Sequence, residues 1–300
     1  MAEIFLKDMA ERNLPERATV GELASRLRQA LAPRYGDGEA QAMTRIIMEE
    51  SLRLAPVDVA LRRDEEVLPE SLLRIDGIVA RLLRGEPIQY IYGHTQWYGA
   101  EIKVTPDVLI PRPETALMID MIVDRWGDRR DLRVMDLCTG SGCIAVTLAR
   151  VLPFARVEGV DISEKALAVA RENASLQHVS VDFRLADVLS MTPPASPVYD
   201  IITCNPPYIP ARDAAAMDAN VLEYEPHMAL FVPDDDPMRF YRPVAAYASK
   251  SLLPGGMLYV ELDPAGAEEV ARCMRDAGLS DVAILRDFAG RMRFATGRKD

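Results

Sequence analysis

The chain is poor in the residues that build metal sites and disulfide frameworks. It has only four cysteines and three histidines in 300 residues. The cysteines are Cys138, Cys143, Cys204 and Cys273, and no two of them form a Cys-x-x-Cys pair. This spacing argues against a zinc site and against a disulfide-stabilised secreted fold. We therefore expect a cytoplasmic protein whose thiols are reduced and which has no metal cofactor.

Long apolar runs and an excess of positive charge are missing as well. No apolar stretch reaches the length of a transmembrane helix, and no charged-then-apolar leader opens the chain. The formal net charge is −11, which argues against a broad electrostatic grip on a nucleic-acid backbone. We expect no membrane insertion and no stable binding of nucleic acid.

The chain is long enough for two domains, and its pattern changes between them. Up to about Gly93, apolar residues recur at spacings of three and four, which predicts a small helical bundle. Helices are predicted from Thr19, where Thr19 and Glu22 have capping-box spacing, over Asp37–Leu54 and over Pro69–Arg84. Three regions follow: a helical domain (1–93), a linking β-hairpin (94–112) and an α/β domain (113–300).

The hairpin is predicted from loose alternation over Gln96–Val104 and a turn at 105–107 that leads into Val108–Ile110. It ends in Pro111-Arg112-Pro113-Glu114-Thr115. The second proline suits the first turn of a helix from Glu114 to about Trp126, and Glu114 lies where the helix dipole favours an anion. Taken alone, Arg112 and Glu114 are also what a surface turn before a helix would show.

Strand and helix patterns alternate from Leu132 onward, which predicts an α/β fold with a doubly wound parallel sheet. The predicted strands are Arg133–Leu137, Arg156–Val160, Ser180–Leu185, Ile201–Cys204, Met257–Glu261, Val282–Leu285 and Arg291–Thr296. The predicted helices between them are Gly142–Leu152, Ser163–Leu176, Pro237–Leu252 and Pro264–Ala277. The last two strands are too close in sequence for a crossover helix, so we expect them to be antiparallel.

A glycine-containing loop, Asp136-Leu137-Cys138-Thr139-Gly140-Ser141-Gly142, ends the first of these strands. Gly140 and Gly142 let the backbone approach a ligand at the carboxyl end of the strand, where open α/β sheets bind nucleotides. Asp161 ends the second strand, where it can accept ribose hydroxyls, and Asp187 ends the third, near the expected adenine. Each acid alone could be a helix cap. The glycine loop, Asp161 and Asp187 follow one another at successive strand ends, and this order predicts an adenosine-bearing cofactor. The spacing of the loop glycines does not separate nicotinamide from other such cofactors.

The fourth strand ends in Asn205-Pro206-Pro207-Tyr208. The prolines hold the backbone extended, so the carbonyls of Asn205 and Pro206 lack ladder partners. With the Asn205 side chain they form a set of acceptors beside the Tyr208 ring, which suits a planar –NH2 group. The bare motif is also compatible with a strand that ends in a proline turn, but its place after Gly140, Asp161 and Asp187 favours the amine site.

Together these motifs resemble class I S-adenosylmethionine-dependent methyltransferases. Their Rossmann-like fold has a seven-stranded sheet with an antiparallel last strand, and their loop is typically D-x-G-x-G-x-G, where this chain has Cys138 in place of the first glycine. Asn-Pro-Pro-Tyr is similar to the motif of enzymes that methylate planar nitrogens. The resemblance implies S-adenosylmethionine as cofactor, bound by Cys138, Thr139, Gly140, Ser141, Gly142, Asp161, Asp187, Val188 and Asn205.

Within this class the chain most resembles protein-glutamine N5-methyltransferases of the HemK/PrmC type. The residues that carry this likeness are Arg84–Ile88, Val108–Thr115, Glu225-Pro226, Ala229-Leu230, Arg286–Phe288 and Thr296–Arg298. It implies methylation of the glutamine in the Gly-Gly-Gln loop of peptide chain release factors, with a helical domain for substrate recognition. Asn205, Pro206 and Tyr208 would be catalytic, and substrate would contact Asn205, Pro206, Pro207, Tyr208, Arg112 and Glu114.

Other functions remain open at this stage. The family often has an acid where Ala116 stands, which leaves the role of the turn before it open. Cys138–Cys143 is reminiscent of sister enzymes that modify a glutamine of a large-subunit ribosomal protein, which leaves the protein substrate open. An adenine-N6 nucleic-acid methyltransferase shares the Asn-Pro-Pro-Tyr chemistry, but the acidic balance speaks against it. Two features argue against a nicotinamide-dependent reductase: the third glycine of the loop motif is replaced by Ala145, and the chain lacks a Tyr-x-x-x-Lys proton donor. The cofactor loop and Asn205 argue against a role as a non-enzymatic adaptor.

Overall fold

The computed structural model describes residues 13–300, which form two compact units that divide between Tyr92 and Gly93. Residues 1–12, the start of the predicted helical domain, lie outside the described residues. Over 13–300, no helix combines the length and the apolar character needed to cross a bilayer.

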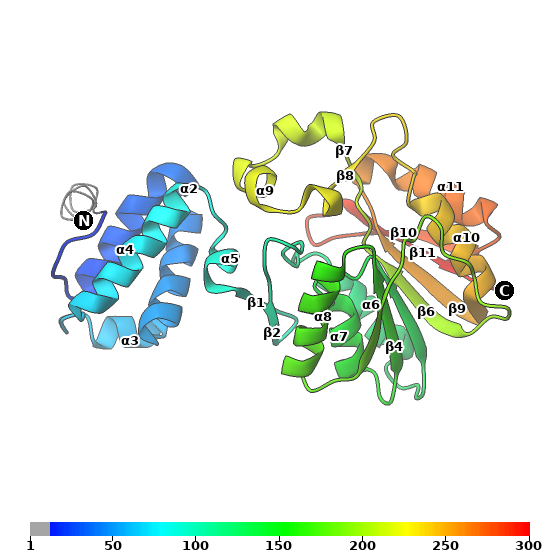
Figure 1. The fold of residues 1–300 in the computed structure, drawn as a ribbon, viewed down its shortest axis with the longest axis horizontal. Coiled ribbons are helices and arrows are strands. Elements are labelled where there is room, and N and C mark those ends of the chain that lie inside the picture. The colour runs from blue at the N-terminus through cyan, green and yellow to red at the C-terminus, as the bar shows by residue number, and fades with distance from the viewer. Residues whose placement is uncertain (1–12) are drawn as a thin grey trace. The chain divides into compact units, whose positions relative to one another are not determined.

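The first unit is helical (Figure 1). Its helices are α2 (Val20–Leu52), α3 (Pro56–Leu61), α4 (Pro69–Leu83) and α5 (Ile88–Tyr92). The capping box is confirmed, since Thr19 Oγ1 accepts the Glu22 N–H at 3.3 Å and the Glu22 carboxylate accepts the Thr19 N–H at 2.9 Å. Gly36, at φ 77°, interrupts α2, so the first two predicted helices are the arms of one broken helix.

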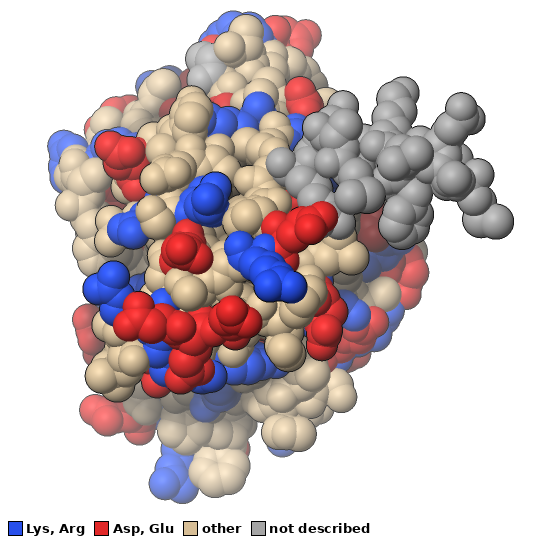
Figure 2. All heavy atoms as spheres, turned by 90° about the vertical axis from the view of Figure 1, so that its left-hand side faces the viewer, with Lys and Arg blue, Asp and Glu red and all other residues tan. Residues whose placement is uncertain are grey.

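The apolar faces of α2 and α4 share one core, in which Leu23, Leu27, Ile47 and Ile75 are fully buried. The surface of this unit mixes charges. Figure 2 shows one face of it, on which acidic and basic side chains lie side by side among uncharged ones. In this unit Arg62 pairs with Glu65, three residues later, at 2.7 Å, and such exposed pairs add little to stability.

The second unit opens with a hairpin of β1 (His94–Trp97) and β2 (Ala100–Lys103). Its turn lies at Tyr98 and Gly99, with φ values of 46° and 68°, as two-residue hairpin turns require. The predicted turn at residues 105–107 exists, since the Val108 N–H donates to the Thr105 carbonyl at 3.0 Å, but its assignment as the hairpin turn is wrong. The chain turns earlier, where two successive residues adopt left-handed conformations, and Val108–Ile110 is not a strand.

Seven strands form the main sheet, in the order β10-β11-β9-β6-β3-β4-β5. They are β3 (Arg133–Leu137), β4 (Arg156–Asp161), β5 (Val181–Leu185), β6 (Tyr199–Cys204), β9 (Leu252–Glu261), β10 (Ser280–Arg286) and β11 (Met292–Arg298). Strand β11 is antiparallel to β9 and β10, whereas the other neighbours run parallel. The predicted fold class and its seven strands are confirmed.

Helices cover both faces of this sheet, with α6, α7 and α8 on one side and α10 and α11 on the other (Figure 1). Their bounds are α6 (Ala116–Trp126), α7 (Cys143–Val151), α8 (Glu164–Leu176), α10 (Tyr241–Ser251) and α11 (Ala267–Asp276), with a 3₁₀ turn η3 (Pro264–Gly266) before α11. Because β3, β4, β5 and β6 run parallel, the loops after them meet at one edge.

The chain leaves the sheet after Cys204, and beyond Tyr208 it forms a segment that the periodicity did not predict. It contains β7 (Ile209–Pro210), η1 (Ala211–Ala216), α9 (Ala219–Tyr224), η2 (His227–Ala229) and β8 (Phe231–Val232). Strands β7 and β8 pair in parallel, which closes residues 209–232 into a unit between β6 and α10.

Candidate active site

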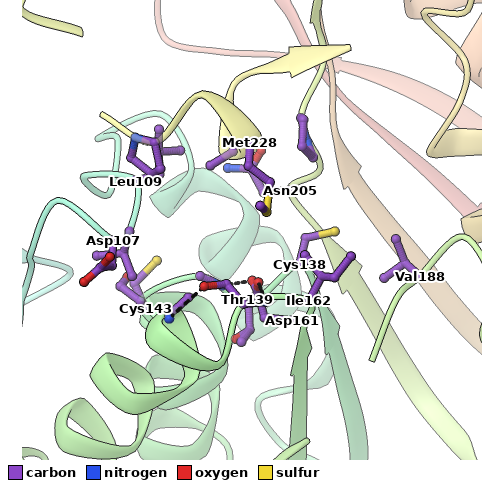
Figure 3. Close-up of a pocket in the computed structure, with 18 of the residues that line it drawn as sticks. Asp107, Leu109, Cys138, Thr139, Cys143, Asp161, Ile162, Val188, Asn205 and Met228 are labelled. Carbon is purple, nitrogen blue, oxygen red and sulfur yellow. Dashed lines mark hydrogen bonds between the residues drawn. The ribbon is translucent and has the colours of Figure 1, made fainter. Parts of the chain in front are cut away.

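A cavity of about 480 Å³ lies at the carboxyl edge of the sheet (Figure 3), and this volume falls in the range of small-molecule sites. The predicted residues that line it are Arg112, Cys138, Thr139, Gly140, Ser141, Asp161, Asp187, Val188, Asn205 and Pro207. Four other predicted residues, all within the described chain, are not part of the lining: Glu114, Gly142, Pro206 and Tyr208. The order of strand ends along the sequence thus brings most of the predicted site to one place.

The glycine loop is built from left-handed residues. Cys138, Gly140 and Gly142 have φ values of 58°, 55° and 77°. Cys138 occupies the position of the first glycine in the resembled motif, and its side chain makes this conformation about 1–2 kcal/mol less favourable. The Gly140 N–H donates to Asp161 Oδ2 at 2.8 Å, so the loop is joined to the end of β4.

The two glycines of this loop are required for different reasons, which predicts different mutant effects. A Cβ at Gly142 would stand 2.9 Å from the Ala170 Cβ and 3.2 Å from the Phe183 ring, whereas a Cβ at Gly140 would meet nothing within 4 Å. We expect Gly142→Ala to lower the free energy of unfolding by more than about 2 kcal/mol, and Gly140→Ala by only about 1 kcal/mol. Urea unfolding of both variants measures the difference; equal losses would contradict this account of the loop.

Asp136, at the end of β3, is the most deeply buried acid of the site. It is 0% exposed, and its carboxylate accepts hydrogen bonds from Thr139 Oγ1 at 2.6 Å and Thr203 Oγ1 at 2.7 Å. Burial raises the pKa of Asp136 to about 6, against the opposing effect of the two hydroxyls. Asp136 holds the loop and β6 together and does not line the cavity.

The raised pKa of Asp136 predicts a pH-dependent contribution to stability. Because the folded-state pKa of about 6 exceeds the ordinary 3.8, the folded state binds the proton more tightly, and the free energy of unfolding falls as pH rises through this interval. The difference amounts to roughly 3 kcal/mol. The side chain of Asp136→Asn carries no charge at either pH. We therefore expect its free energy of unfolding, relative to that of the wild type, to be higher at pH 7.5 than at pH 4. Denaturant titrations at both pH values measure this, with the exposed Asp182→Asn as control; a pH-independent difference would contradict it.

Asp161 and Asp187 shape their own loops as well as facing the cavity. Asp161 Oδ1 accepts the Ser163 N–H at 2.9 Å, and Asp187 Oδ1 accepts the Leu189 N–H at 2.9 Å. Burial raises the pKa of Asp161, and the N–H groups of Ser163 and Gly140 oppose that rise. Each carboxylate oxygen has a second lone pair, so these acids can still accept hydrogen bonds from a ligand.

Asn205 is half-buried and lies with Met228 across the cavity from Thr139 and Asp161 (Figure 3). Pro206 and Pro207 are buried. Tyr208 is not part of the cavity lining, and its hydroxyl donates to Glu261 Oε1 at 3.1 Å. The motif therefore presents one polar side chain to the cavity.

Helix α6 begins at Ala116, two residues later than predicted. Residues 113–115 form turns instead, in which the N–H groups of Thr115 and Ala116 donate to the carbonyls three residues earlier. The Thr115 hydroxyl does not cap the helix but donates to Glu261 Oε2 at 2.6 Å. Glu261, at the end of β9, was not predicted to be a site residue. Because Glu261 lies far from Thr115 and Tyr208 in the sequence, no spacing pattern connects it with them.

Arg112 and Glu114 are each engaged in an ion pair. Arg112 donates through Nη2 to Glu225 Oε1 at 2.7 Å, and the other Glu225 oxygen accepts the Ile110 N–H at 3.2 Å. These bonds join the segment before α6 to the segment after Tyr208. Glu114 pairs with Arg291 at 3.4 Å. Only Arg112 of the two lines the cavity.

Known proteins resemble the chain in both units. Residues 22–93 match the PrmC N-terminal domain family, and residues 113–223 match the methyltransferase small domain family. A release factor glutamine methyltransferase of Bacteroides thetaiotaomicron is 39% identical over 280 residues, 93% of this chain and 100% of that protein. One of Flavobacterium psychrophilum is 36% identical over 268 residues, 88% of this chain and 94% of that protein. A solved methyltransferase from Pyrococcus furiosus shares the fold, with TM-score 0.50 and 16% identity over 74% of this chain and 98% of its own.

Proposed function

This chain belongs to the release factor glutamine methyltransferase family, and we propose that it methylates the glutamine of the Gly-Gly-Gln loop of a peptide chain release factor on the side-chain nitrogen N5. The methyl donor is S-adenosylmethionine. The observation that carries the proposal is the position of Asn205 across one cavity from the glycine loop and Asp161.

The cavity fits an adenosine-bearing methyl donor. A Cβ at Gly140 would point into open space, so the backbone can approach a ligand there. Cys138–Gly142, Asp161, Asp187 and Val188 would hold the donor, with the Asp161 carboxylate accepting the ribose hydroxyls. S-adenosylmethionine supplies a methyl group on an electron-poor sulfur when it is bound.

Catalysis by this site is positional. A primary amide nitrogen is a weak nucleophile because its lone pair is delocalised into the carbonyl, and no group of the motif is a suitable base. Burial raises the pKa of the Tyr208 hydroxyl above its ordinary value, so Tyr208 stays protonated at neutral pH. Asn205 Oδ1 and the Pro206 carbonyl accept the two amide hydrogens and aim the nitrogen for in-line attack. The same acceptors stabilise these hydrogens as they become more acidic in the transition state.

We assign residues 1–93 to recognition of the release factor, 94–112 to a linker and 113–300 to catalysis. The mixed acidic and basic surface in Figure 2 suits a protein partner better than a phosphate backbone, which favours a continuous basic surface. A release factor substrate places the enzyme in the cytoplasm.

The test is transfer of label from methyl-labelled S-adenosylmethionine. We expect label on a release factor and none on the same factor with its loop glutamine replaced by alanine. Large-subunit ribosomal proteins and DNA, tested in parallel, represent the other nitrogen-methylating functions. Label on either of those with none on the release factor would overturn the proposal.

A further inference from the structure

A buried carboxylate lies behind the Asn-Pro-Pro-Tyr motif. Glu261 ends β9, next to β6 in the sheet, and is only 2% exposed. Removing a carboxylate from water is unfavourable unless its oxygens are hydrogen-bonded. Burial raises the pKa of Glu261, and the hydroxyls of Thr115 and Tyr208 oppose that rise. A buried acid at this edge of the sheet therefore calls for an explanation beyond packing.

Both side-chain oxygens of Glu261 are used to hold segments of the active site. Oε1 accepts the Tyr208 hydroxyl at 3.1 Å, and Oε2 accepts the Thr115 hydroxyl at 2.6 Å. Its main-chain oxygen accepts a third hydroxyl, that of Tyr241, at 3.1 Å. Thr115 lines the cavity and follows the Pro-Arg-Pro-Glu turn. One side chain thus connects the turn before α6 with the motif after β6.

Tyr208 is the member of the motif whose position most needs such a partner. The prolines restrict the backbone up to Pro207, but the Tyr208 side chain has two rotatable bonds of its own. A hydrogen bond at the far end of the ring removes that freedom. Because Glu261 is anchored by Thr115 and by the β9 backbone, the bond gives the Tyr208 side chain one orientation.

We propose that Glu261 is a positioning residue for glutamine methylation: by holding the Tyr208 side chain, it fixes the segment after β6 that carries Asn205 and the Pro206 carbonyl. This inference rests on the proposed function. Glu261 touches neither substrate nor cofactor and acts through Tyr208. Loss of the bond is expected to reduce turnover and to leave binding of both substrates unchanged.

The chain offers a matched pair of variants. Tyr208 and Tyr241 each donate a hydroxyl to Glu261 at 3.1 Å, one to the side chain and the other to the main chain. We expect Tyr208→Phe to lower kcat about tenfold, because a loosely held motif misplaces the acceptors that aim the reacting nitrogen. Tyr241→Phe is expected to stay within about twofold of wild-type kcat, since it loses an equivalent buried bond that does not orient the Tyr208 ring. KM for the release factor and for S-adenosylmethionine is expected to change less than about twofold in both.

Substitution of Glu261 completes the test. Glu261→Leu is expected to lower kcat as Tyr208→Phe does, and the double variant is expected to be no slower than Glu261→Leu alone, because both remove the same contact. Glu261→Gln keeps an oxygen acceptor for Tyr208 and is expected to retain kcat within about threefold. If Glu261→Leu does not fold, the tyrosine pair and Glu261→Gln decide the matter.

Several results would overturn the inference: multiplicative losses in the double variant, equal losses for the two tyrosine variants, wild-type kcat for Tyr208→Phe, or a Glu261→Gln enzyme as slow as Tyr208→Phe. Failure of the proposed function looks different, because the wild-type enzyme itself would then leave the release factor unlabelled. Thermal unfolding of every variant separates loss of turnover from loss of folded protein.

Discussion

Asn205→Ala is expected to reduce kcat for release factor methylation by about 1,000-fold or more, because it removes the side-chain acceptor that aims and stabilises the amide hydrogens. Asn205 is half-buried at the cavity and lies outside the glycine loop. The glycine loop, Asp161, Asp187 and Val188 supply the other predicted contacts to S-adenosylmethionine, so affinity for the donor is expected to change little. Single-turnover transfer of labelled methyl at saturating donor, together with calorimetric titration of the donor, measures the two quantities separately.

The structure also predicts the stability of this variant. The strand before Asn205 is held by its pairing with β3 and β9, and the following prolines are buried. The unfolding temperature of Asn205→Ala is thus expected to stay close to that of the wild type. Normal turnover of the folded variant would rule out the positional mechanism.

Asp161→Ala is expected to weaken binding of S-adenosylmethionine roughly 10- to 100-fold, the effect of losing charge-assisted hydrogen bonds to a ligand. The structure adds a second cause, since Asp161 Oδ2 also accepts the Gly140 N–H at 2.8 Å. Removal of the carboxylate leaves that N–H without its acceptor and loosens the loop that approaches the donor. Calorimetry with S-adenosylmethionine measures the change in Kd.

A conservative variant separates the two causes. Asp161→Asn keeps an oxygen acceptor for the N–H of either Gly140 or Ser163 but loses the charge. We therefore expect its affinity for S-adenosylmethionine to lie between those of the wild type and Asp161→Ala. At saturating donor, both Asp161 variants are expected to recover most of kcat, the reverse of the pattern for Asn205→Ala. An unchanged Kd for Asp161→Ala would show that the carboxylate does not hold the ribose.

Local sequence patterns determined most of the secondary structure of this protein. The capping box at Thr19 and Glu22, the seven strands of the sheet and the antiparallel arrangement of β10 and β11 followed from periodicity and connection length. The hairpin turn at Tyr98 and Gly99 was missed because it depends on a left-handed residue that is not glycine. The segment at 209–232 was missed because its elements are too short for periodicity to detect.

The sequence by itself also predicted that the glycine loop, Asp161, Asp187 and Asn205 meet at one cavity, because a parallel sheet collects the ends of successive strands at one edge. Only the tertiary structure decided how those residues are held. Glu225 binds Arg112 and Ile110, and Glu261 binds Thr115 and Tyr208. These partners lie far apart along the chain and come together only when the sheet and its loops assemble. Spacing predicts contacts within one element or between neighbouring strand ends, whereas hydrogen bonds between distant segments depend on the complete fold.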